Sequence, residues 1–550
     1  MKNNILKIHP KDNVIVALRD LEAGETVRLD GRTYTLSEKI PGKHKFTTKN
    51  FEIGDAIIMY GVLIGKATRP IPEGCRISRE NVVHAVDNFD KVERKLTWNI
   101  PDIVEFRDST FNGYHRTDGK VGTMNYWLVV PLVFCENRNI EIIKASMMEQ
   151  LGYTFEKDYV VDTHRLVRLY QSGADKEVLL KENILKDAAA IKHNRVFPNV
   201  DGIKFLSHDG GCGGMPQDSE ALCRLIAGYI LHPNVAGATV LSLGCQHAQF
   251  KILEKAIDDI SGDFKKPLFV LEQQKSKSER AFIAEAVKKT FVGLMEANEI
   301  ERKPAALGHL SLGLECGGSD GFSGISANPV LGYTSDLLVA LGGTTMLSEF
   351  PELNGVEREL IARCENDTLA EKFSNLMTAY SNRAVESGAG FDMNPSPGNI
   401  KDGLITDAMK SAGAAKKGGT SPVRGVLDYT EIATKKGLNL LCTPGNDVES
   451  TTGLAGSGAN VILFTTGLGT PTGNPIVPVI KVATNNALAE RMGDIVDFNT
   501  GTIITGEDTI ESKGRALLKY VIQVANGEAI PAAVRLGQDD FIPWKRGISL

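Results

Sequence analysis

The chain has 550 residues, too many for one hydrophobic core, so we expect two or three domains. Its hydrophobic content of 42%, charged content of 24% and net charge of −6 are ordinary for a globular protein, and no run of Lys and Arg points to a nucleic-acid or membrane partner. The N-terminus, MKNNILKIHPKDN, lacks the apolar core of a signal peptide, and no apolar stretch is long enough to cross a bilayer. The scattered cysteines form no disulfide framework. We therefore expect a cytoplasmic protein with a small-molecule partner, and leave open whether it is a homo-oligomer.

The first part of the chain is rich in short strands and shows no helical periodicity. Glycine, proline and charged turns separate these strands, so residues 1–90 are predicted to form a small all-β domain. A polar stretch with few apolar runs follows, and we interpret residues 91–115 as a linker. The predicted strands are 14–18, 25–29, 32–36, 55–61 and 62–68.

The pattern then changes to alternating strands and helices, which predicts an α/β domain at 116–299 with a parallel sheet. Its first strand, YWLVVPLVF at 126–134, is continuously apolar, as expected of a strand buried on both faces. The charged segment 153–195 interrupts the pattern and is interpreted as an insertion. Further strands are expected at 202–208, 238–244 and 267–274, with helices near 140–152, 217–230, 248–260 and 276–298.

A second α/β region is predicted at 300–550. The fold class is therefore a small all-β domain followed by two α/β regions with largely parallel sheets. Ligands bind at the carboxyl ends of strands in such sheets, so the glycine-rich polar segments after the strands are the candidate sites. The strands expected in this region are 310–315, 344–349, 438–443, 460–466 and 477–483.

Three of these segments place a cysteine beside glycine just past a strand: Cys212, Cys245 and Cys316. One interpretation is a thiolate metal site, preferably for iron, because soft sulfur ligands suit iron and zinc. The other is three small packing thiols, because cysteine is commonly buried. No CxxC pair supports a zinc ribbon.

Histidines also occupy suggestive positions. His44 and Lys45 lie in the turn PGKHKF of the β domain, and either form a proton-transfer pair or metal-ligand site on a lid, or belong to a surface turn. His208 and His247 stand at predicted strand ends.

The common nucleotide and hydrolase motifs are missing. GLGTPTG at 467–473 has the wrong spacing for a dinucleotide loop and precedes another strand where a helix should begin. No GxxxxGK[ST] and no GxSxG occur. An oxidoreductase that acts through a bound nucleotide is therefore disfavoured.

Several long polar segments resemble the altronate and galactarate dehydratase family. They are GDAIIMYGVLIGKATRPIPEG, GYHRTDGKVGTMN (113–125), LECGGSDGFSGISANPVLG (314–332), GGTTMLSE (342–349), NPSPGN (394–399) and NLLCTPGND (439–447). The resemblance runs from end to end, with 153–195 as the main departure. It implies that the N-terminal domain is of the SAF type, a β-clip fold, with its GHK-like turn at Gly42–Lys45.

The resemblance implies β-elimination of water from a sugar acid with Fe2+, Mn2+ being the alternative metal. An iron–sulfur cluster with three thiolate ligands is a further interpretation of the cysteine site itself. The segments at 314–332 and 394–399 are closer to altronate dehydratases, so the expected reaction is D-altronate to 2-keto-3-deoxy-D-gluconate. Galactarate dehydratase and sulfolactate lyase are alternatives within the family. The alternative from another class is a non-catalytic sugar-acid-binding protein.

Roles follow for individual residues. Abstraction of a proton α to a carboxylate needs a base, an acid for the leaving hydroxyl and a metal or cationic donors for the developing charge. We assign proton transfer to His44, Lys45 and His208, and predict that Cys212, Cys245 and Cys316 converge at the interface of the α/β regions as metal ligands. The predicted substrate-binding residues are Arg116, Asn125, Ser319, Asp320, Asn328, Asn399, Asn446 and Asp447.

Overall fold

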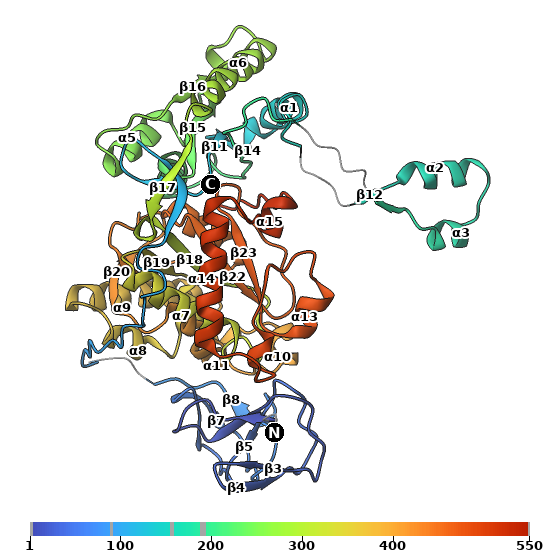
Figure 1. Ribbon diagram of the computed structural model, residues 1–550, viewed down its shortest axis with the longest axis vertical. Coiled ribbons are helices and arrows are strands. Elements are labelled where there is room, and N and C mark those ends of the chain that lie inside the picture. The colour runs from blue at the N-terminus through green and yellow to red at the C-terminus, as the bar shows by residue number, and fades with distance from the viewer. Residues whose placement is uncertain (1–3, 88–91, 155–158, 188–193, 548–550) are drawn as a thin grey trace.

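The computed structural model describes residues 4–87, 92–154, 159–187 and 194–547. It confirms the predicted fold class, a strand-rich N-terminal part followed by α/β parts with parallel sheets. The parts are stacked along the long axis of the molecule: the β domain at one end, the C-terminal α/β domain in the middle and the second domain at the other end (Figure 1).

The N-terminal domain contains small antiparallel sheets, ordered β1-β2-β5, β3-β4 and β6-β7-β8. Its strands are short because glycine turns interrupt them, and apolar side chains such as Ile15 and Phe46 fill the interior. The predicted boundary at residue 90 lies outside the described residues. The strands are β1 (Ile5–Leu6), β2 (Val14–Ala17), β3 (Thr26–Leu29), β4 (Arg32–Thr35), β5 (Lys45–Thr47), β6 (Ala56–Met59), β7 (Val62–Ala67) and β8 (Val82–Val83).

The second domain has a four-stranded parallel sheet in the order β14-β11-β15-β16. Trp127 of β11 is fully buried against α6, where a Cβ on Gly293 would lie 2.0 Å from its ring, so only glycine fits there. The elements are β11 (Tyr126–Pro131), η1 (Phe134–Glu136), α1 (Asn137–Met147), β14 (Gly202–Phe205), α4 (Pro216–Leu231), β15 (Val235–Ser242), α5 (Phe250–Ile260), β16 (Leu268–Glu272), η2 (Gln273–Lys275) and α6 (Glu279–Ala297).

Within the segment 153–195, the described part projects away from this domain (Figure 1). It contains β12 (Tyr159–Val161), α2 (Thr163–Gln171), α3 (Lys176–Lys181) and β13 (Leu185–Asp187). None of these elements has a buried residue. These four elements therefore add little to the packing of the second domain.

A small antiparallel sheet connects the two α/β domains. Its strands are β9 (Thr110–His115), β10 (Val121–Gly122) and β17 (Arg302–Ala306), in the order β10-β9-β17. Part of the predicted linker is thus a strand, paired with the segment that leads into the C-terminal domain.

The C-terminal domain is built on a seven-stranded, wholly parallel sheet in the order β20-β21-β19-β18-β22-β23-β24. The first strand of this domain in chain order, β18, lies in the middle of the sheet. The next strands, β19 to β21, lie on one side of it, and β22 to β24 lie on the other. No helix of the described residues is long and apolar enough to span a membrane. The strands are β18 (Ser311–Cys316), β19 (Thr344–Leu347), β20 (Val423–Leu427), β21 (Gly437–Leu441), β22 (Val461–Thr466), β23 (Val479–Ala483) and β24 (Phe498–Asn499).

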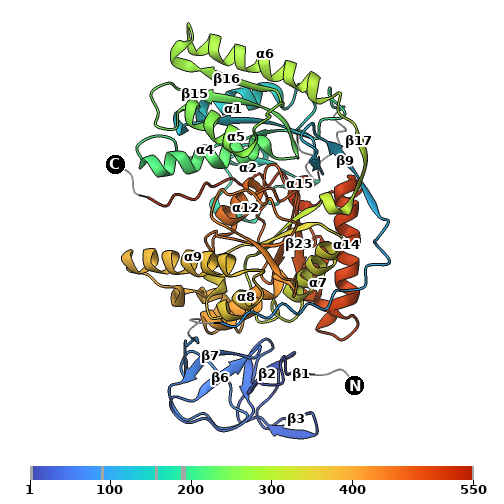
Figure 2. The ribbon, with the colours of Figure 1, turned by 90° about the vertical axis from the view of Figure 1, so that its left-hand side faces the viewer.

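Helices cover both faces of this sheet, and α14 packs along α7 (Figure 2). On the face toward the second domain, α12 packs against α4 so closely that a Cβ on Gly228 would lie 2.3 Å from the Gly456 carbonyl oxygen. The helices are η3 (Leu307–His309), α7 (Ala327–Ala340), η4 (Phe350–Leu353), α8 (Glu357–Ala362), α9 (Asp367–Glu386), η5 (Phe391–Met393), α10 (Pro397–Lys401), α11 (Asp407–Ala414), η6 (Ala415–Gly418), α12 (Asp447–Gly456), α13 (Asn486–Arg491), η7 (Gly501–Ile503), α14 (Ile510–Asn526) and α15 (Ala532–Arg535).

Candidate active site

The strand order defines a crevice at the carboxyl edge of the C-terminal sheet. The chain runs from β18 to β19 on one side and returns to β22 on the other, so β18 and β22 flank a topological switch point. Ligands of open parallel sheets bind in such crevices. The loop 317–326 after β18 and the loop 467–470 after β22 meet there, since the amides of Gly467 and Leu468 both bond to the Gly318 carbonyl.

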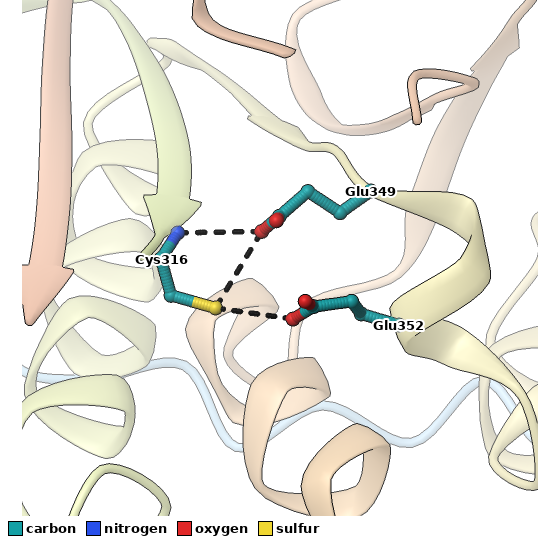
Figure 3. A group of neighbouring side chains, drawn as sticks. All are labelled: Cys316, Glu349 and Glu352. Atoms are coloured by element: carbon teal, nitrogen blue, oxygen red, sulfur yellow. Dashed lines mark hydrogen bonds between the residues drawn. The ribbon is translucent and has the colours of Figure 1, made fainter. Parts of the chain in front are cut away.

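A buried group of charged side chains lies at this edge. Cys316 ends β18, while Glu349 and Glu352 follow β19, and the three side chains point toward one another (Figure 3). The Cys316 Sγ lies 3.5 Å from Glu349 Oε2 and 3.3 Å from Glu352 Oε2. Lys417 Nζ donates to Cys316 Sγ at 2.8 Å and to Glu349 Oε2 at 2.6 Å, and Lys410 Nζ donates to Glu352 Oε1 at 2.5 Å. We call these five residues the charge cluster.

The charge cluster holds its protons unevenly. Burial and the neighbouring carboxylates raise the pKa of the Cys316 thiol well above its usual value. Burial and the charge of Glu349 likewise raise the pKa of the adjacent Glu315. Burial alone would raise the pKa of Glu352, but the Lys410 and Lys417 ammonium groups outweigh it and lower that pKa. The thiol is therefore protonated and Glu352 ionised at neutral pH, and the surroundings of Glu315 favour its protonated form.

The donor set of the charge cluster fits a divalent metal ion. The ligand atoms of Cys316, Glu349 and Glu352 all lie within 4.8 Å of one another. One thiolate and two carboxylates form a mixed soft and hard set that iron or manganese accepts. Within the described residues, Glu349 Oε1 has no hydrogen-bond partner, which leaves acceptor capacity. A bound ion would have to displace the Lys417 ammonium from Cys316 Sγ.

The N-terminal domain docks onto the same edge through its predicted turn. His44 Nε2 lies 3.2 Å from the Lys401 carbonyl oxygen, and Lys45 Nζ donates to the Gly403 carbonyl at 2.7 Å. Burial and the charge of Lys45 lower the pKa of His44, and burial lowers the pKa of Lys45 to about 7. The His44 ring is therefore neutral at neutral pH and Lys45 is close to losing its charge, which suits proton transfer.

Asp320 anchors this docking. Its fully buried carboxylate accepts from the Phe322 amide and lies 3.1 Å from Lys43 Nζ, which also reaches Asp402 at 2.9 Å. Burial alone would lower the pKa of Lys43, but the two carboxylates outweigh it and raise that pKa. The Lys43–Asp320 pair therefore fixes the turn, and with it His44, over the loop that follows β18.

Two predicted amides have structural roles near this edge. The Asn399 Nδ2 donates to the Ser319 carbonyl at 2.7 Å, which ties α10 to the loop after β18. Asn328 is buried and links α7 to β22, because its Oδ1 accepts from Thr465 Oγ1 at 2.7 Å. Ser319 and Asn399 thus join the neighbourhood of Asp320, while the Asn328 side chain is occupied by the fold.

Asn446 and Asp447 open α12 at the carboxyl edge. Asn446 is exposed, and its Oδ1 caps the helix by accepting from the backbone amides of Val448 and Glu449. Burial and Glu349 raise the pKa of Asp447 to about 7. Asp447 therefore sits between the solvent-facing rim and the charge cluster.

Lys481 of β23 is a further ionisable group that the sequence did not single out. Its ammonium lies 4.4 Å from the centre of the Phe464 ring, and within the described residues its Nζ has no hydrogen-bond partner. Burial lowers the pKa of Lys481 to about 8, against the opposing charges of Asp497 and Asp447. An unpaired buried amine beside a carboxyl with a raised pKa forms a second potential proton-transfer pair.

Arg116 and Asn125 do not belong to this site, which corrects the sequence prediction. Asn125 immediately precedes β11, at the amino edge of the second sheet and not at the carboxyl edge where ligands bind. The buried Arg116 guanidinium bonds to the Pro233 carbonyl, the Met124 carbonyl and Asn125 Oδ1. These contacts stabilise the start of β11. Because all three guanidinium nitrogens donate within the protein, the side chain is not available to bind a substrate carboxylate in a bidentate pair.

His208 also needs a correction. Its Nε2 lies 2.8 Å from the Pro131 carbonyl oxygen, and its Nδ1 accepts from the Gly210 amide at 3.1 Å. Burial lowers the pKa of His208, in agreement with a neutral ring. Because both ring nitrogens bond to backbone, the side chain shapes the loop after β14 and is not free for proton transfer.

The structure separates the three cysteines that were predicted to converge. Cys316 is buried in the charge cluster, whereas Cys212 and Cys245 are exposed in the second domain. In the part of the chain that the structure describes, the one group of close metal-ligand atoms contains Cys316 with two glutamates and neither of the other thiols. The three segments share a cysteine beside glycine after a strand, but the folded chain places Cys316 in one domain and Cys212 and Cys245 in another.

The charge cluster also contains residues that sequence reasoning missed. Glu349 and Glu352 directly follow the strand β19, so the strand-end rule could have selected them. Lys417 lies in AAKKGG, whose charge is typical of a surface. Only the fold shows that its ammonium is buried, with a relative exposure of 1%.

A cavity of about 810 Å³ lies elsewhere, between the second and C-terminal domains. Ser311, Thr344 and Asn460 line it, and these residues stand at the starts of β18, β19 and β22. It thus opens at the amino edge of the C-terminal sheet, away from the charge cluster.

Sequence comparison covers nearly the whole chain. Three family profiles match in order: the altronate/galactarate dehydratase SAF domain at 3–85, the D-galactarate dehydratase/altronate hydrolase second domain at 113–298, and the D-galactarate/altronate dehydratase C-terminal domain at 307–549.

Individual relatives agree. Altronate dehydratase of Bacillus subtilis (strain 168) is 32% identical over 96% of both chains. Altronate dehydratase of Escherichia coli (strain K12) is 32% identical over 95% of both, and the L-threo-forming galactarate dehydratase of that strain is 33% identical over 95% of this chain and 93% of its own. The chain therefore belongs to the altronate/galactarate dehydratase family and is a sugar-acid dehydratase, a lyase.

Proposed function

We propose that the protein converts D-altronate to 2-keto-3-deoxy-D-gluconate in the cytoplasm, at the carboxyl edge of the C-terminal sheet. The observation that carries this proposal is the docking of the Lys43–Lys45 turn onto the loop after β18, beside the charge cluster. Cationic donors, buried carboxyls and a neutral histidine meet there. Those groups are what removal of an α-proton and loss of a β-hydroxyl require.

In this proposal the N-terminal domain is a lid that excludes water and brings His44 to the substrate. His44 takes the α-proton, because its lowered pKa leaves the ring neutral. Lys45, whose pKa lies at about 7, holds the turn by donating to the Gly403 carbonyl, and in this proposal it exchanges protons with His44. Asp447 and Lys481 form the second pair, which can protonate the leaving hydroxyl.

Iron is the proposed metal, with manganese as the alternative, and Cys316, Glu349 and Glu352 would hold it. When bound, a divalent ion stabilises negative charge on the substrate carboxylate. Asn446, exposed at the start of α12, and Ser319, Asp320 and Asn399 around the loop after β18 surround the proposed substrate position. Asn446 is the one of these whose side chain faces solvent.

The substrate is tested by kinetics, because the altronate and galactarate relatives are equally similar to this chain. Purified protein with Fe2+ and reductant should turn over D-altronate at least about ten-fold faster than galactarate or sulfolactate, which corresponds to about 1.4 kcal/mol in the barrier. Formation of the 2-keto-3-deoxy acid is the readout. Faster turnover of galactarate or sulfolactate would contradict D-altronate as the substrate. Binding of all three compounds without turnover would indicate a sugar-acid-binding protein.

A further inference from the structure

Three cysteines gather at the carboxyl edge of the second domain's sheet, outside the proposed active site. Of the eight cysteines in the chain, Cys135, Cys212 and Cys245 are exposed, while the others are buried or half-buried. Free cysteine is among the most often buried residues, so three exposed thiols in one domain require an explanation.

The sheet order places the loops that carry these thiols side by side. Cys212 follows β14, Cys135 follows β11 and Cys245 follows β15, and these strands are adjacent and parallel in the order β14-β11-β15. Parallel strands present their carboxyl ends at one edge, where ligands bind. Cys135 was not singled out by sequence reasoning because it continues an apolar run.

Backbone contacts join the three loops. The Phe134 amide, next to Cys135, donates to the Gly210 carbonyl at 3.1 Å, and the Gly211 carbonyl accepts from Ala248 at 3.0 Å. The Gly213 amide, next to Cys212, donates to His247 Nδ1 at 3.3 Å. Each thiol is therefore within two or three residues of a contact with another thiol's loop.

The surroundings leave room for a bulky ligand. A cavity of about 310 Å³ lies beside Cys212, the one of the three cysteines that lines it, and is bordered by Phe134, the loop Gly210–Gly214 and Trp544. Gly211 and Gly213 have positive φ values of 96° and 68°, which only glycine adopts freely, so the loop that carries Cys212 depends on them. The site combines three thiols on adjacent loops with space beside one of them.

We propose that Cys135, Cys212 and Cys245 bind an iron–sulfur cluster. A single ion needs its ligand atoms in mutual contact, and these thiols do not meet that condition in the described residues. A cluster spreads its thiolates over separate irons, so it accommodates more widely spaced thiols on three loops. Each thiol loses a proton as its Fe–S bond forms, and three thiolates leave one iron of a cubane open.

The test is anaerobic reconstitution of the full-length protein with Fe2+, sulfide and dithiothreitol, followed by assay of iron, acid-labile sulfide and visible absorption. Labile sulfide should be retained with an equal amount of iron, in addition to the iron that the charge cluster holds. Each of Cys135→Ser, Cys212→Ser and Cys245→Ser should lower the labile sulfide, and the iron that accompanies it, by at least about ten-fold, with unchanged circular dichroism because these side chains are exposed. Cys75→Ser, a half-buried thiol of the N-terminal domain, is the matched control and should retain both.

The proposal is independent of the proposed function, and its outcomes are separable from it. Cys316→Ser should remove only iron that is not accompanied by sulfide. Iron retained without sulfide in the wild type would overturn the cluster. Full retention of iron and sulfide in any of the three variants would overturn the ligand assignment, and their loss in Cys316→Ser alone would move the cluster to the C-terminal domain.

Discussion

In both α/β domains, cysteine and glycine follow strands of the central sheet, as at Cys212 and Cys316, but the surroundings of these cysteines differ between the two domains. In the second domain the edge is open, and its thiols are exposed. In the C-terminal domain the N-terminal domain covers the edge, and Cys316 lies among carboxylates and ammonium groups. The difference teaches that what packs over a strand end decides the chemistry of a residue there.

The strongest test of this comparison is His44→Ala, which removes the side chain that the covering domain brings to the edge. Loss of a general base costs about 10²–10⁴-fold in rate, so kcat should fall by that factor. The fold should stay intact, since His44 makes one long contact to a backbone carbonyl. Solvent exchange of the substrate's α-proton should stop while iron stays bound.

The exposed His164 of the insertion provides the matched control, and His164→Ala should leave kcat unchanged. Near-normal turnover of His44→Ala would locate the base elsewhere, with the Lys481–Asp447 pair as the next candidate.

A second test removes a charge from the covered edge. Lys417→Met leaves Glu349 without its buried ammonium partner and should lower the free energy of unfolding by about 3–5 kcal/mol in chemical denaturation. The neighbouring Lys416 pairs with Glu359 at a half-exposed position, so Lys416→Met should cost less than about 1 kcal/mol. Equal losses of unfolding free energy in the two variants would show that the burial of the Lys417–Glu349 pair does not affect stability.

A third test uses pH. The folded protein releases the Lys45 proton with a pKa of about 7, whereas the unfolded chain keeps it up to its ordinary value of 10.5. Between these values unfolding takes up a proton, so Lys45 makes the free energy of unfolding rise with pH by up to about 1.4 kcal/mol per pH unit. Lys45→Met should remove this rise relative to wild type between pH 7 and about 10.

The exposed Lys39 of the same domain is the control, and Lys39→Met should leave the slope unchanged in that window. Parallel pH profiles for wild type and Lys45→Met would mean that Lys45 is solvated at the docked edge.

The smallest effect on stability is expected from the insertion in the second domain. Replacing residues 159–187 by a short linker removes elements without buried residues and keeps the bond from Tyr153 Oη to the Phe197 carbonyl. Shortening a surface loop changes the closure entropy little, so the free energy of unfolding should change by less than about 1 kcal/mol, with turnover retained. Loss of folding, seen by circular dichroism, would assign the segment to the core.

Much of the fold was predictable from local pattern. The apolar run at 126–134 predicts the central strand β11, and the structure has it at Tyr126–Pro131. Strands buried on both faces must be apolar throughout, so the sequence carries that signal directly. The small sheet of β9, β10 and β17 was missed, because it pairs residues far apart in the chain and has no such run.

Some residues of the candidate site were likewise predictable from local sequence and others were not. The sequence by itself marked the turn at His44 and the thiol of Cys316, since a glycine-initiated turn and a strand end are local features. It could not place Lys417 beside Cys316, because the two are 101 residues apart and a lysine pair in a glycine-rich segment is typical of a surface.

The sequence thus determined which residues stand at strand ends and in turns, because backbone conformation depends mainly on near neighbours. Only the tertiary structure decided which of those ends is covered and which is open. Burial, and the pKa values and pairings that follow from it, depends on segments that meet through packing and are distant in sequence. Cys316 and Cys212 share a local pattern, and the glutamates and the lysine that pack against Cys316 give it a different environment.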